Sequence, residues 1–229
     1  MIKLTIIIPV YNEIKTIEKL IKKILKINIK KQLIIVDDGS SDGTRLVLTK
    51  YKNRIDNLIF HKKNLGKGAA IQTAKKFISG DIVLIQDADL EYDPQDYTKL
   101  IKPIINGDAQ VVYGSRVLGK KRYFVKNFSS IYRIFFNHVL TIFSNVLNKQ
   151  ELTDAHTCYK VFSTKLFNSI ELRENGFSFC PEITTKISKM NISIIEIPIA
   201  YHGRSYKEGK KIKVSDGFEA IITILKYKF

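Results

Sequence analysis

The stretch DIVLIQDADLEYDP, residues 81–94, decides how this sequence is interpreted. Its first six residues are almost continuously apolar, which is typical of a parallel strand covered on both faces. Asp87 and Asp89 follow where such a strand would end. In open sheets of parallel strands, ligands bind at the carboxyl ends of the strands. The stretch therefore predicts a buried strand that brings two carboxylates to a ligand site.

The same pattern, an apolar run followed by polar residues, recurs through the first half of the chain. Strands are predicted over 4–10 (LTIIIPV), 33–38 (LIIVDD), 58–61 (LIFH), 81–86 (DIVLIQ) and 109–114 (AQVVYG). Amphipathic stretches predict helices over 14–27, 42–51, 68–78 and 95–105. This alternation predicts an α/β fold, an open, doubly wound, mostly parallel sheet flanked by helices.

The second half of the chain has a different composition. Residues 116–150 contain seven Lys and Arg and neither Asp nor Glu. Helices are expected over 129–148 and 215–227, and strands over 154–162 and 192–199. Because no linker rich in Pro or Gly separates the halves, a single domain over 1–229 is expected, with a division near residue 114.

Composition narrows the functional classes. With 45% hydrophobic residues and five Pro among 229, the chain is neither disordered nor collagen-like. Two Cys without a CxxC spacing and four scattered His favour a reduced compartment and argue against a zinc site. The net charge of +16 indicates a polyanionic partner: nucleic acid, an anionic membrane or a phosphorylated substrate. The apolar N-terminal run is too short for a signal peptide, and the longest uncharged run, 134–148, is too short and polar to span a bilayer.

Four polar motifs follow the predicted strands: PVYNE (9–13), DDGSSDGT (37–44), NLGKGA (64–69) and QDADLE (86–91). Buried carboxylates as close as Asp87 and Asp89 repel unless a cation compensates them, and a divalent ion bridging to a diphosphate satisfies both. Tyr11 is suited to stack on a base while Asp38 accepts from its ring N–H. The loop around Lys67 brings backbone and a cation to a nucleotide. Neither a GxGxxG nor a GxxxxGK[ST] pattern is present, which excludes the two common nucleotide-binding fingerprints.

Together these motifs resemble glycosyltransferase family 2, and within it the dolichyl- or polyprenyl-phosphate sugar synthases. The similarity continues through YGSRVLG (113–119), TDAHTCYKVF (153–162), GFSFCPEIT (176–184) and RSYKEGKKI (204–212). The resemblance implies the GT-A fold. It also implies a nucleotide-sugar-binding half over 1–114 and an acceptor- and membrane-facing half over 115–229.

The resemblance also implies roles for individual residues. Donor-binding residues are Pro9, Tyr11, Glu13, Asp38, Gly66, Lys67, Asp87 and Asp89. Mg²⁺ or Mn²⁺ is expected at Asp87 and Asp89, with Glu91, where many relatives have Gln, as a third candidate ligand. Asp89 and Asp154 are the candidate catalytic carboxylates, and Glu182 is a weaker one. Acceptor or phosphate contacts are assigned to Arg116, Arg133, Arg204 and Lys210.

The implied reaction is an inverting transfer from a GDP- or UDP-sugar, and two acceptors stay open. A polyprenyl phosphate is already anionic, whereas a glycan hydroxyl needs a base such as Asp154. The processive polysaccharide synthases are excluded, since their QxxRW signature requires a Trp and this chain has none. A nucleic-acid-binding protein is disfavoured, because no such motif is present and the acidic strand ends would repel a phosphate backbone.

The helix expected over 129–148 separates apolar from polar residues. Two apolar rows follow helical spacing, Phe135, Val139, Ile142 and Val146, and beside them Phe136, Leu140, Phe143 and Leu147. The other side carries the polar residues Asn137, Thr141, Ser144, Asn145 and Asn148. Beside a cationic loop, this pattern predicts peripheral docking on an anionic membrane, at its cytoplasmic face. A helix that packs this apolar side into the core is the alternative.

Overall fold

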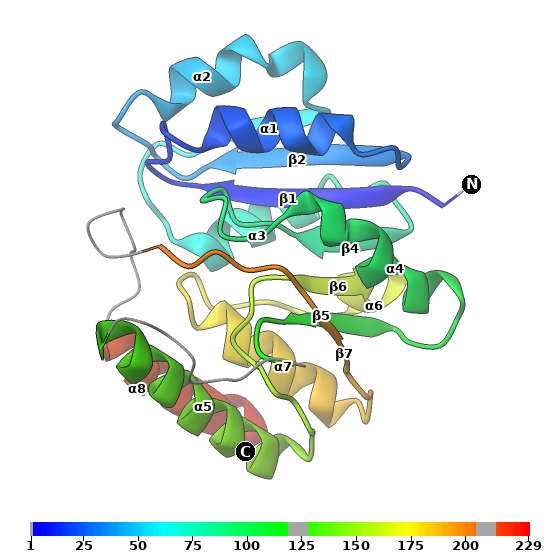
Figure 1. Ribbon diagram of the computed structural model, residues 1–229, viewed down its shortest axis with the longest axis vertical. Coiled ribbons are helices and arrows are strands. Elements are labelled where there is room, and N and C mark those ends of the chain that lie inside the picture. The colour runs from blue at the N-terminus through cyan, green and yellow to red at the C-terminus, as the bar shows by residue number, and fades with distance from the viewer. Residues whose placement is uncertain (1, 119–127, 205–213) are drawn as a thin grey trace.

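The computed structural model describes residues 2–118, 128–204 and 214–229, without the side chains of residues 128–133 and 214 (Figure 1). The strands are β1 (Leu4–Val10), β2 (Lys31–Asp37), β3 (Asn57–Phe60), β4 (Ile82–Ile85), β5 (Val111–Ser115), β6 (Lys160–Ser163) and β7 (Ile195–Pro198). The α-helices are α1 (Ile17–Lys26), α2 (Thr44–Lys50), α3 (Lys67–Lys75), α4 (Tyr97–Ile105), α5 (Phe128–Asn148), α6 (Thr164–Ser169), α7 (Phe179–Lys189) and α8 (Val214–Lys228). Two short 3-10 helices are η1 (Lys52–Arg54) and η2 (Pro94–Asp96).

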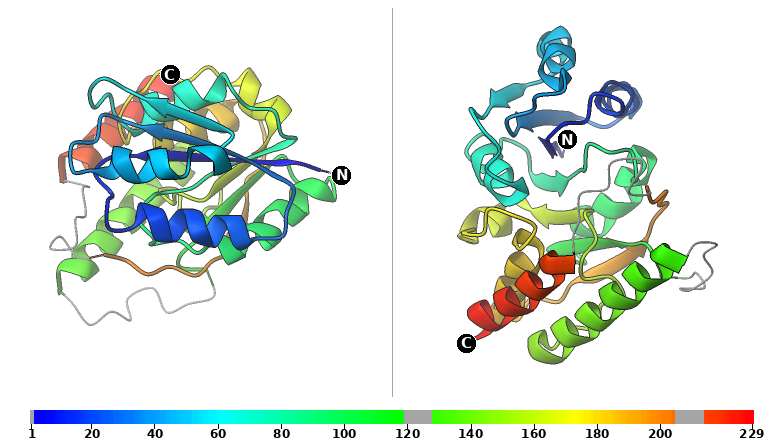
Figure 2. Two further views of the ribbon diagram at one scale, coloured as in Figure 1. Left: turned by 90° about the horizontal axis from the view of Figure 1, so that it is seen from above. Right: turned by 90° about the vertical axis from the view of Figure 1, so that its left-hand side faces the viewer.

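The described strands form one seven-stranded sheet in the order β3-β2-β1-β4-β6-β5-β7. Strand β6 runs antiparallel to β4 and β5, and the other neighbouring pairs are parallel. Helices α1 and α4 cover one face, and α3 and α7 cover the other (Figure 2). The predicted mostly parallel sheet with flanking helices is therefore confirmed.

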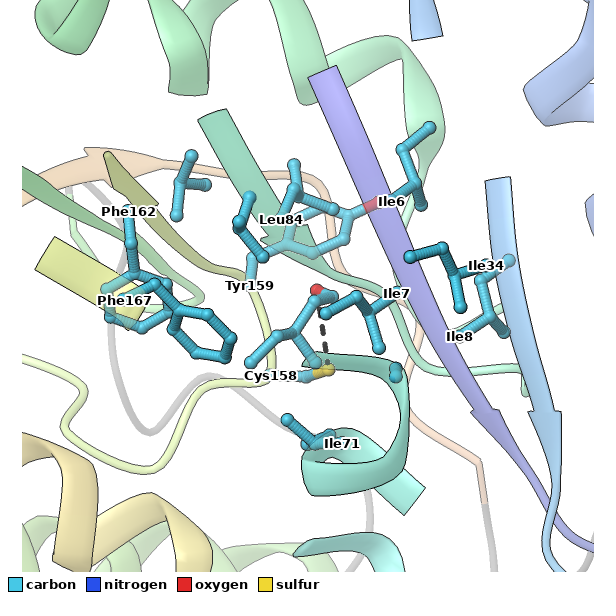
Figure 3. Close-up of a cluster of buried hydrophobic side chains, with 14 of the residues drawn as sticks. Ile6, Ile7, Ile8, Ile34, Ile71, Leu84, Cys158, Tyr159, Phe162 and Phe167 are labelled. Atoms are coloured by element: carbon cyan, nitrogen blue, oxygen red, sulfur yellow. Dashed lines mark hydrogen bonds between the residues drawn. The ribbon is translucent and has the colours of Figure 1, made fainter. Parts of the chain in front are cut away.

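The core explains why the first strands are so continuously apolar. Ile6, Ile7 and Ile8 of β1 are all fully buried, because helices cover both faces of this central strand. Figure 3 shows them packing in one cluster with side chains from β2, β4, α3 and β6. Burial of such side chains contributes about 1.5–3 kcal/mol each to folding. The sheet is thus a rigid platform whose strand ends carry the polar motifs.

The second half departs from the sequence predictions in two places. The strand expected over 154–162 is limited to Lys160–Ser163, because side chains rather than a neighbouring strand bind the backbone before it. Helices α6 and α7 were not predicted. In α7, the apolar spacing of Phe179, Ile183 and Ile187 is obscured by buried polar residues between them.

Helix α5 presents its polar side to the protein and its apolar side outward. Thr141, Ser144 and Asn148 are almost wholly buried, whereas Val146 is 74% exposed. The apolar stripe of α5 consists of Phe135, Val139, Ile142 and Val146. The core-helix alternative is therefore wrong.

Helix α8 lies beside α5 and also exposes apolar residues, although it buries Ala220 and Ile224 as well as Thr223 (Figures 1 and 2). Its apolar stripe consists of the exposed residues Phe218, Ile222, Leu225 and Phe229. The two stripes have the same spacing along their helices, i, i+4, i+7 and i+11. Among the described residues, no helix combines the length and apolar character needed to cross a bilayer.

Candidate active site

The carboxyl ends of β1, β2 and β4 bring the first predicted residues together. These strands are parallel neighbours, so Pro9 in β1, Asp38 after β2 and Asp87 after β4 lie at one edge of the sheet. The loops after β1 and β2 are joined directly, since the Asn12 N–H donates to Ser40 Oγ at 2.9 Å and Asn12 Oδ1 accepts from the backbone N–H of residue 41. This junction leaves Tyr11 half-buried beside the edge.

Asp38 fixes the loop that follows β3. Its carboxylate accepts from the backbone N–H groups of Leu65 and Gly66 at 2.9 and 2.7 Å. The same carboxylate lies 2.7 Å from His61 Nδ1, and His61 Nε2 lies 3.0 Å from Thr73 Oγ1. Asp38 therefore fixes the loop beside this edge of the sheet, a role that its motif did not reveal, and the predicted base contact stays a prediction.

The glycines of this loop allow the chain to approach itself. Gly66 has a φ of 102°, and an added Cβ would lie 2.3 Å from the Asn175 carbonyl oxygen. A Cβ on Gly68 would lie 2.0 Å from the Glu174 carbonyl oxygen. The close backbone approach expected toward a nucleotide is thus made, in this structure, toward the segment before α7.

Lys67 turns from this loop to the first aspartate. Its Nζ donates to Asp87 Oδ1 at 2.6 Å and lies 3.5 Å from Cys158 Sγ. Burial raises the pKa of Asp87, but the Lys67 ammonium outweighs it and holds that pKa below its usual range. Asp87 is therefore an ionised carboxylate with one lysine as its counterion.

Asp89 lies in an acidic cluster that one arginine bridges. Arg204 contacts both Glu13 oxygens at 3.0 and 3.1 Å and Asp89 Oδ2 at 3.1 Å. Burial, followed by the charges of Asp87 and Glu91, raises the pKa of Asp89 to about 7. A pKa this high means that the positive charge near Asp89 does not fully compensate the negative charge of its carboxylate.

Glu91 is engaged with the segment that carries Arg204. One oxygen accepts from the Tyr201 hydroxyl at 2.7 Å, and the other accepts from the Arg204 backbone N–H at 2.7 Å. Within the described residues, no three His, Cys, Asp or Glu side chains form a group that could hold a metal ion. Glu91 anchors this segment, and its predicted role as a metal ligand gains no support from the geometry.

The carboxylates of Asp87 and Asp89 still fit a divalent cation. Magnesium is usually held by one or two carboxylates together with phosphate oxygens, and needs no cage made only of protein. The undercompensated charge at Asp89, two residues from Asp87, is the kind of site that such an ion stabilises. Asp87 and Asp89 are the residues that would hold it.

Arg116 and Asp154 form a buried ion pair at the end of β5. Arg116 Nε and a terminal nitrogen donate to the two Asp154 oxygens, both at 2.7 Å. Burial raises the pKa of Asp154, but Arg116 reverses this and lowers it. The guanidinium carbon lies 5.2 Å from the Tyr201 ring centre, so Tyr201 connects this pair to Glu91.

The remaining predicted residues, Glu182, Arg133 and Lys210, all lie in the second half of the chain. Glu182 is fully buried and binds the backbone N–H groups of Arg173 and Glu174, so it has a structural position. Arg133 belongs to α5, but its side chain lies outside the described residues, as does the whole of Lys210.

Sequence reasoning missed Tyr201, which binds Glu91, and two residues that bind the backbone beside Asp154. Glu196 accepts from the Asp154 N–H, and Lys160 donates to the Ala155 carbonyl oxygen. Tyr201 and Glu196 lie in or after an expected strand, without a motif to mark them. Lys160 offered a signal, since it is a cation within the apolar run CYKVF. Lysine is almost never fully buried unless it is paired, so a lysine inside a predicted core strand indicates a specific partner.

Known proteins are similar in sequence to this chain over most of its length. It is 30% identical over 242 aligned residues to a UDP-N-acetylglucosamine–dolichyl-phosphate N-acetylglucosaminyltransferase of Methanococcus voltae, covering 97% of this chain and 95% of that protein. It is 27% identical to a dolichyl-phosphate beta-glucosyltransferase of Trichomonas vaginalis, covering 96% and 71%. It is 28% identical to a dolichol-phosphate mannosyltransferase of Pyrococcus furiosus, covering 91% and 59%.

A solved structure and a family model agree with these relatives. Glucosyl-3-phosphoglycerate synthase of Mycobacterium tuberculosis, in complex with Mn²⁺, uridine diphosphate and phosphoglyceric acid, superposes with a TM-score of 0.72 at 19% identity. The superposition covers 99% of this chain and 78% of that one, and it confirms the expected GT-A fold. The model of glycosyl transferase family 2 matches residues 5–171, well over half of the chain. The chain therefore belongs to glycosyl transferase family 2 and is a glycosyltransferase.

Proposed function

We propose that this glycosyltransferase moves a sugar from a GDP- or UDP-sugar to a polyprenyl phosphate, with inversion at the anomeric carbon. The observation that carries the proposal is the Arg116–Asp154 ion pair. Both Asp154 oxygens accept from one guanidinium and the pKa of Asp154 is lowered, so this carboxylate is a weak proton acceptor. A phosphate oxygen is already anionic and needs no strong base, whereas a sugar hydroxyl does.

The acceptor assignment has independent support. The named relatives from Methanococcus voltae and Trichomonas vaginalis, which align with nearly the whole chain, carry dolichyl phosphate in their names. Arg116 uses two N–H donors on Asp154, and we assign its other donors to the acceptor phosphate. A planar guanidinium held in one orientation is well suited to bind phosphate oxygens in pairs.

On the donor side, the residues at the strand ends have separate roles. Tyr11 stacks on the base, beside the loop that Asp38 holds. Arg204 brings positive charge to the diphosphate from its place between Glu13 and Asp89. A divalent cation bound by Asp87 and Asp89, Mg²⁺ or Mn²⁺, supplies Lewis-acid stabilisation of the departing nucleoside diphosphate.

We assign the apolar stripes of α5 and α8 to an anionic membrane surface on its cytoplasmic face. The stripes lie on two helices that contact each other, and exposed apolar residues on neighbouring elements mark a candidate interaction site. The surplus of cations in residues 116–150 complements anionic lipid headgroups, at about 1 kcal/mol for each Lys or Arg near the surface. Docking there would bring the site to an acceptor whose lipid tail stays in the bilayer.

A panel of radiolabelled donors tests the transfer. UDP- and GDP-sugars are each offered with polyprenyl phosphate in detergent or with soluble glycans, and the product is extracted into organic solvent. We expect label in the organic phase only when both polyprenyl phosphate and a divalent ion are present. Label that stays in aqueous glycan would establish the hydroxyl acceptor instead.

A pair of arginine variants tests the acceptor contact. Arg116→Lys should raise the KM for polyprenyl phosphate about ten- to a hundredfold, the cost of one charge-assisted contact. Arg173→Lys is the matched control, since Arg173 also makes two contacts to one carboxylate, that of Glu171, but on the exposed surface. If Arg116→Lys and Arg173→Lys have the same KM for polyprenyl phosphate, Arg116 does not contact the acceptor.

Liposome flotation tests the docking surface. Ile142→Glu combined with Ile222→Glu should abolish binding to vesicles of anionic lipid, and salt should weaken wild-type binding. Leu46→Glu, at an exposed position of α2, is the control and should bind normally. Undiminished binding by the double variant would show that these stripes are not the membrane contact.

A further inference from the structure

Lys160 is a lysine inside the protein core. It opens β6, is fully buried, and pairs across the strands with Tyr113 of β5. Its Nζ lies 3.5 Å from the centre of the Tyr113 ring and donates to the Ala155 carbonyl oxygen at 2.8 Å. The ammonium is therefore directed at the turn that carries Asp154.

That turn is held from its other side by a second charged residue. The Glu196 carboxylate of β7 accepts from the backbone N–H groups of Thr153 and Asp154 at 2.6 and 2.9 Å. It also accepts from the Thr153 hydroxyl at 2.7 Å. Lys160 and Glu196 thus bind the main chain on the two sides of Asp154, one with positive and one with negative charge.

Folding alone does not require this arrangement. Burying an ammonium costs several kcal/mol, and apolar residues of similar volume often replace buried charges without loss of stability. An apolar side chain at position 160 would fill the same space against Tyr113 without that penalty. The charge serves two contacts that an apolar side chain cannot make, the approach of the ammonium to the Tyr113 ring and the bond to the Ala155 carbonyl. Only the second reaches the turn that carries Asp154.

We infer that Lys160 and Glu196 are positioning residues for the acceptor: they fix the backbone around Asp154, which in turn aims Arg116 at the acceptor's phosphate. Neither residue touches the substrate. The inference rests on the proposed function for the identity of the acceptor. Its structural part, that Lys160 and Glu196 immobilise the Arg116–Asp154 pair, stands without it.

Lys160→Met tests the inference, with Lys75→Met as its matched control. Lys75 Nζ also donates to a backbone carbonyl, that of Ile170, and lies over an aromatic ring, that of Phe167. It lies on α3, outside the Arg116–Asp154 pair and its contacts. Glu196→Gln is a second, independent variant, because the two N–H groups of the turn bind different carboxylate oxygens and the amide nitrogen of Gln cannot accept from either.

We expect Lys160→Met and Glu196→Gln to raise the KM for polyprenyl phosphate by about tenfold, since misplacing a binding group by a fraction of an ångström has effects of this size. The KM for the donor should change by less than about twofold, because the displaced group serves the acceptor. Lys160→Met should keep or raise the melting temperature. Lys75→Met should leave both KM values unchanged.

A chemical readout separates this inference from the proposed function. Phenylglyoxal modifies accessible arginines, and mass spectrometry measures its rate at Arg116 without any substrate. We expect faster modification of Arg116 in Lys160→Met and Glu196→Gln than in the wild type or Lys75→Met. Unchanged modification in both variants would overturn the inference whatever the acceptor is, while a wild type that never labels polyprenyl phosphate would overturn only the proposed function.

Discussion

Helices α1 and α5 are both amphipathic, yet they face opposite ways. In α1 the apolar residues Ile17, Leu20, Ile21 and Ile24 are fully buried against the sheet. In α5 the buried residues are polar, and the apolar stripe is exposed. Amphipathic periodicity thus predicts that a helix has two faces, but it does not predict which face the protein itself covers.

The same contrast extends to the two halves of the molecule. In the first half, the apolar residues build the core and the charged groups lie at the strand ends, where a ligand can reach them. In the second half, apolar residues such as Phe162, Phe179 and Ile183 join the same core, but the buried Lys160 and the half-buried Glu196 also bind the backbone around Asp154. The first half depends on the second, since β6 lies between β4 and β5 in the sheet, while α5 and α8 of the second half leave apolar side chains exposed.

The largest effect is expected at the strand ends of the first half. Asp89→Asn should lower the turnover number about a thousandfold, because the charge that stabilises a leaving diphosphate is worth several kcal/mol. The melting temperature should not fall, since the change relieves repulsion from Asp87 and Glu91. Turnover close to wild type in the presence of a divalent ion would show that the first half does not hold the metal through Asp89.

A pair of isoleucines tests the opposite orientation of the two helices directly. Ile21→Ala in α1 should lower the free energy of unfolding by about 2–5 kcal/mol, since it opens a cavity in the core. Ile142→Ala in α5 should change it by no more than about 0.5 kcal/mol, because Ile142 is already half-exposed. Urea denaturation measures both, and similar losses would mean that the α5 stripe is covered by protein in solution.

The buried Lys160 makes the stability of the protein dependent on pH. Burial lowers the pKa of Lys160 to about 8 from 10.5, although Cys180 and Asp154 oppose the shift. Below pH 8 the folded protein carries a buried ammonium, so Lys160→Met should exceed the wild type in stability. As the pH rises from 8 to 10.5, the folded wild type loses this proton before the unfolded chain does, and its relative stability increases.

The difference in unfolding free energy between Lys160→Met and wild type should therefore shrink by about 3 kcal/mol across that window. Denaturation at a series of pH values measures this difference, and the other titrating groups cancel between the two proteins. A difference that stays constant from pH 8 to 10.5 would mean that Lys160 titrates as an exposed lysine does.

Sequence alone predicted the first half well, because there one physical rule dominates. Continuous apolar runs such as 4–10 require burial on both faces, and parallel pairing then places the polar motifs at one edge. The positions of Asp87, Asp89 and Glu13 after such runs are therefore enough to predict that they share one region. What the motifs did not reveal was which partner each carboxylate has, such as Lys67 for Asp87.

The second half was predicted less well, because its contacts join residues that are distant in sequence and individually ordinary. The strand expected over 154–162 begins only at Lys160, since Glu196, more than forty positions away, binds the backbone where the prediction placed the start of the strand. The pairing of Arg116 with Asp154 also depends on how β5 meets this turn. Periodicity carries no information about such pairs.

The smallest effect is expected where α5 meets the turn that carries Asp154. Asn145 Nδ2 donates to the Leu152 carbonyl oxygen at 2.7 Å, and Asn145 Oδ1 accepts from the Leu152 N–H at 3.1 Å. Leu152 is buried, so Asn145→Ala would leave both backbone groups without these partners and should lower the free energy of unfolding by about 2 kcal/mol. Val146→Ala, one residue further and 74% exposed, should lower it by less than about 0.5 kcal/mol. If the polar face of α5 is what attaches it to the protein, urea denaturation will show the larger loss at the asparagine, and the reverse order would mean that α5 is held through its apolar side after all.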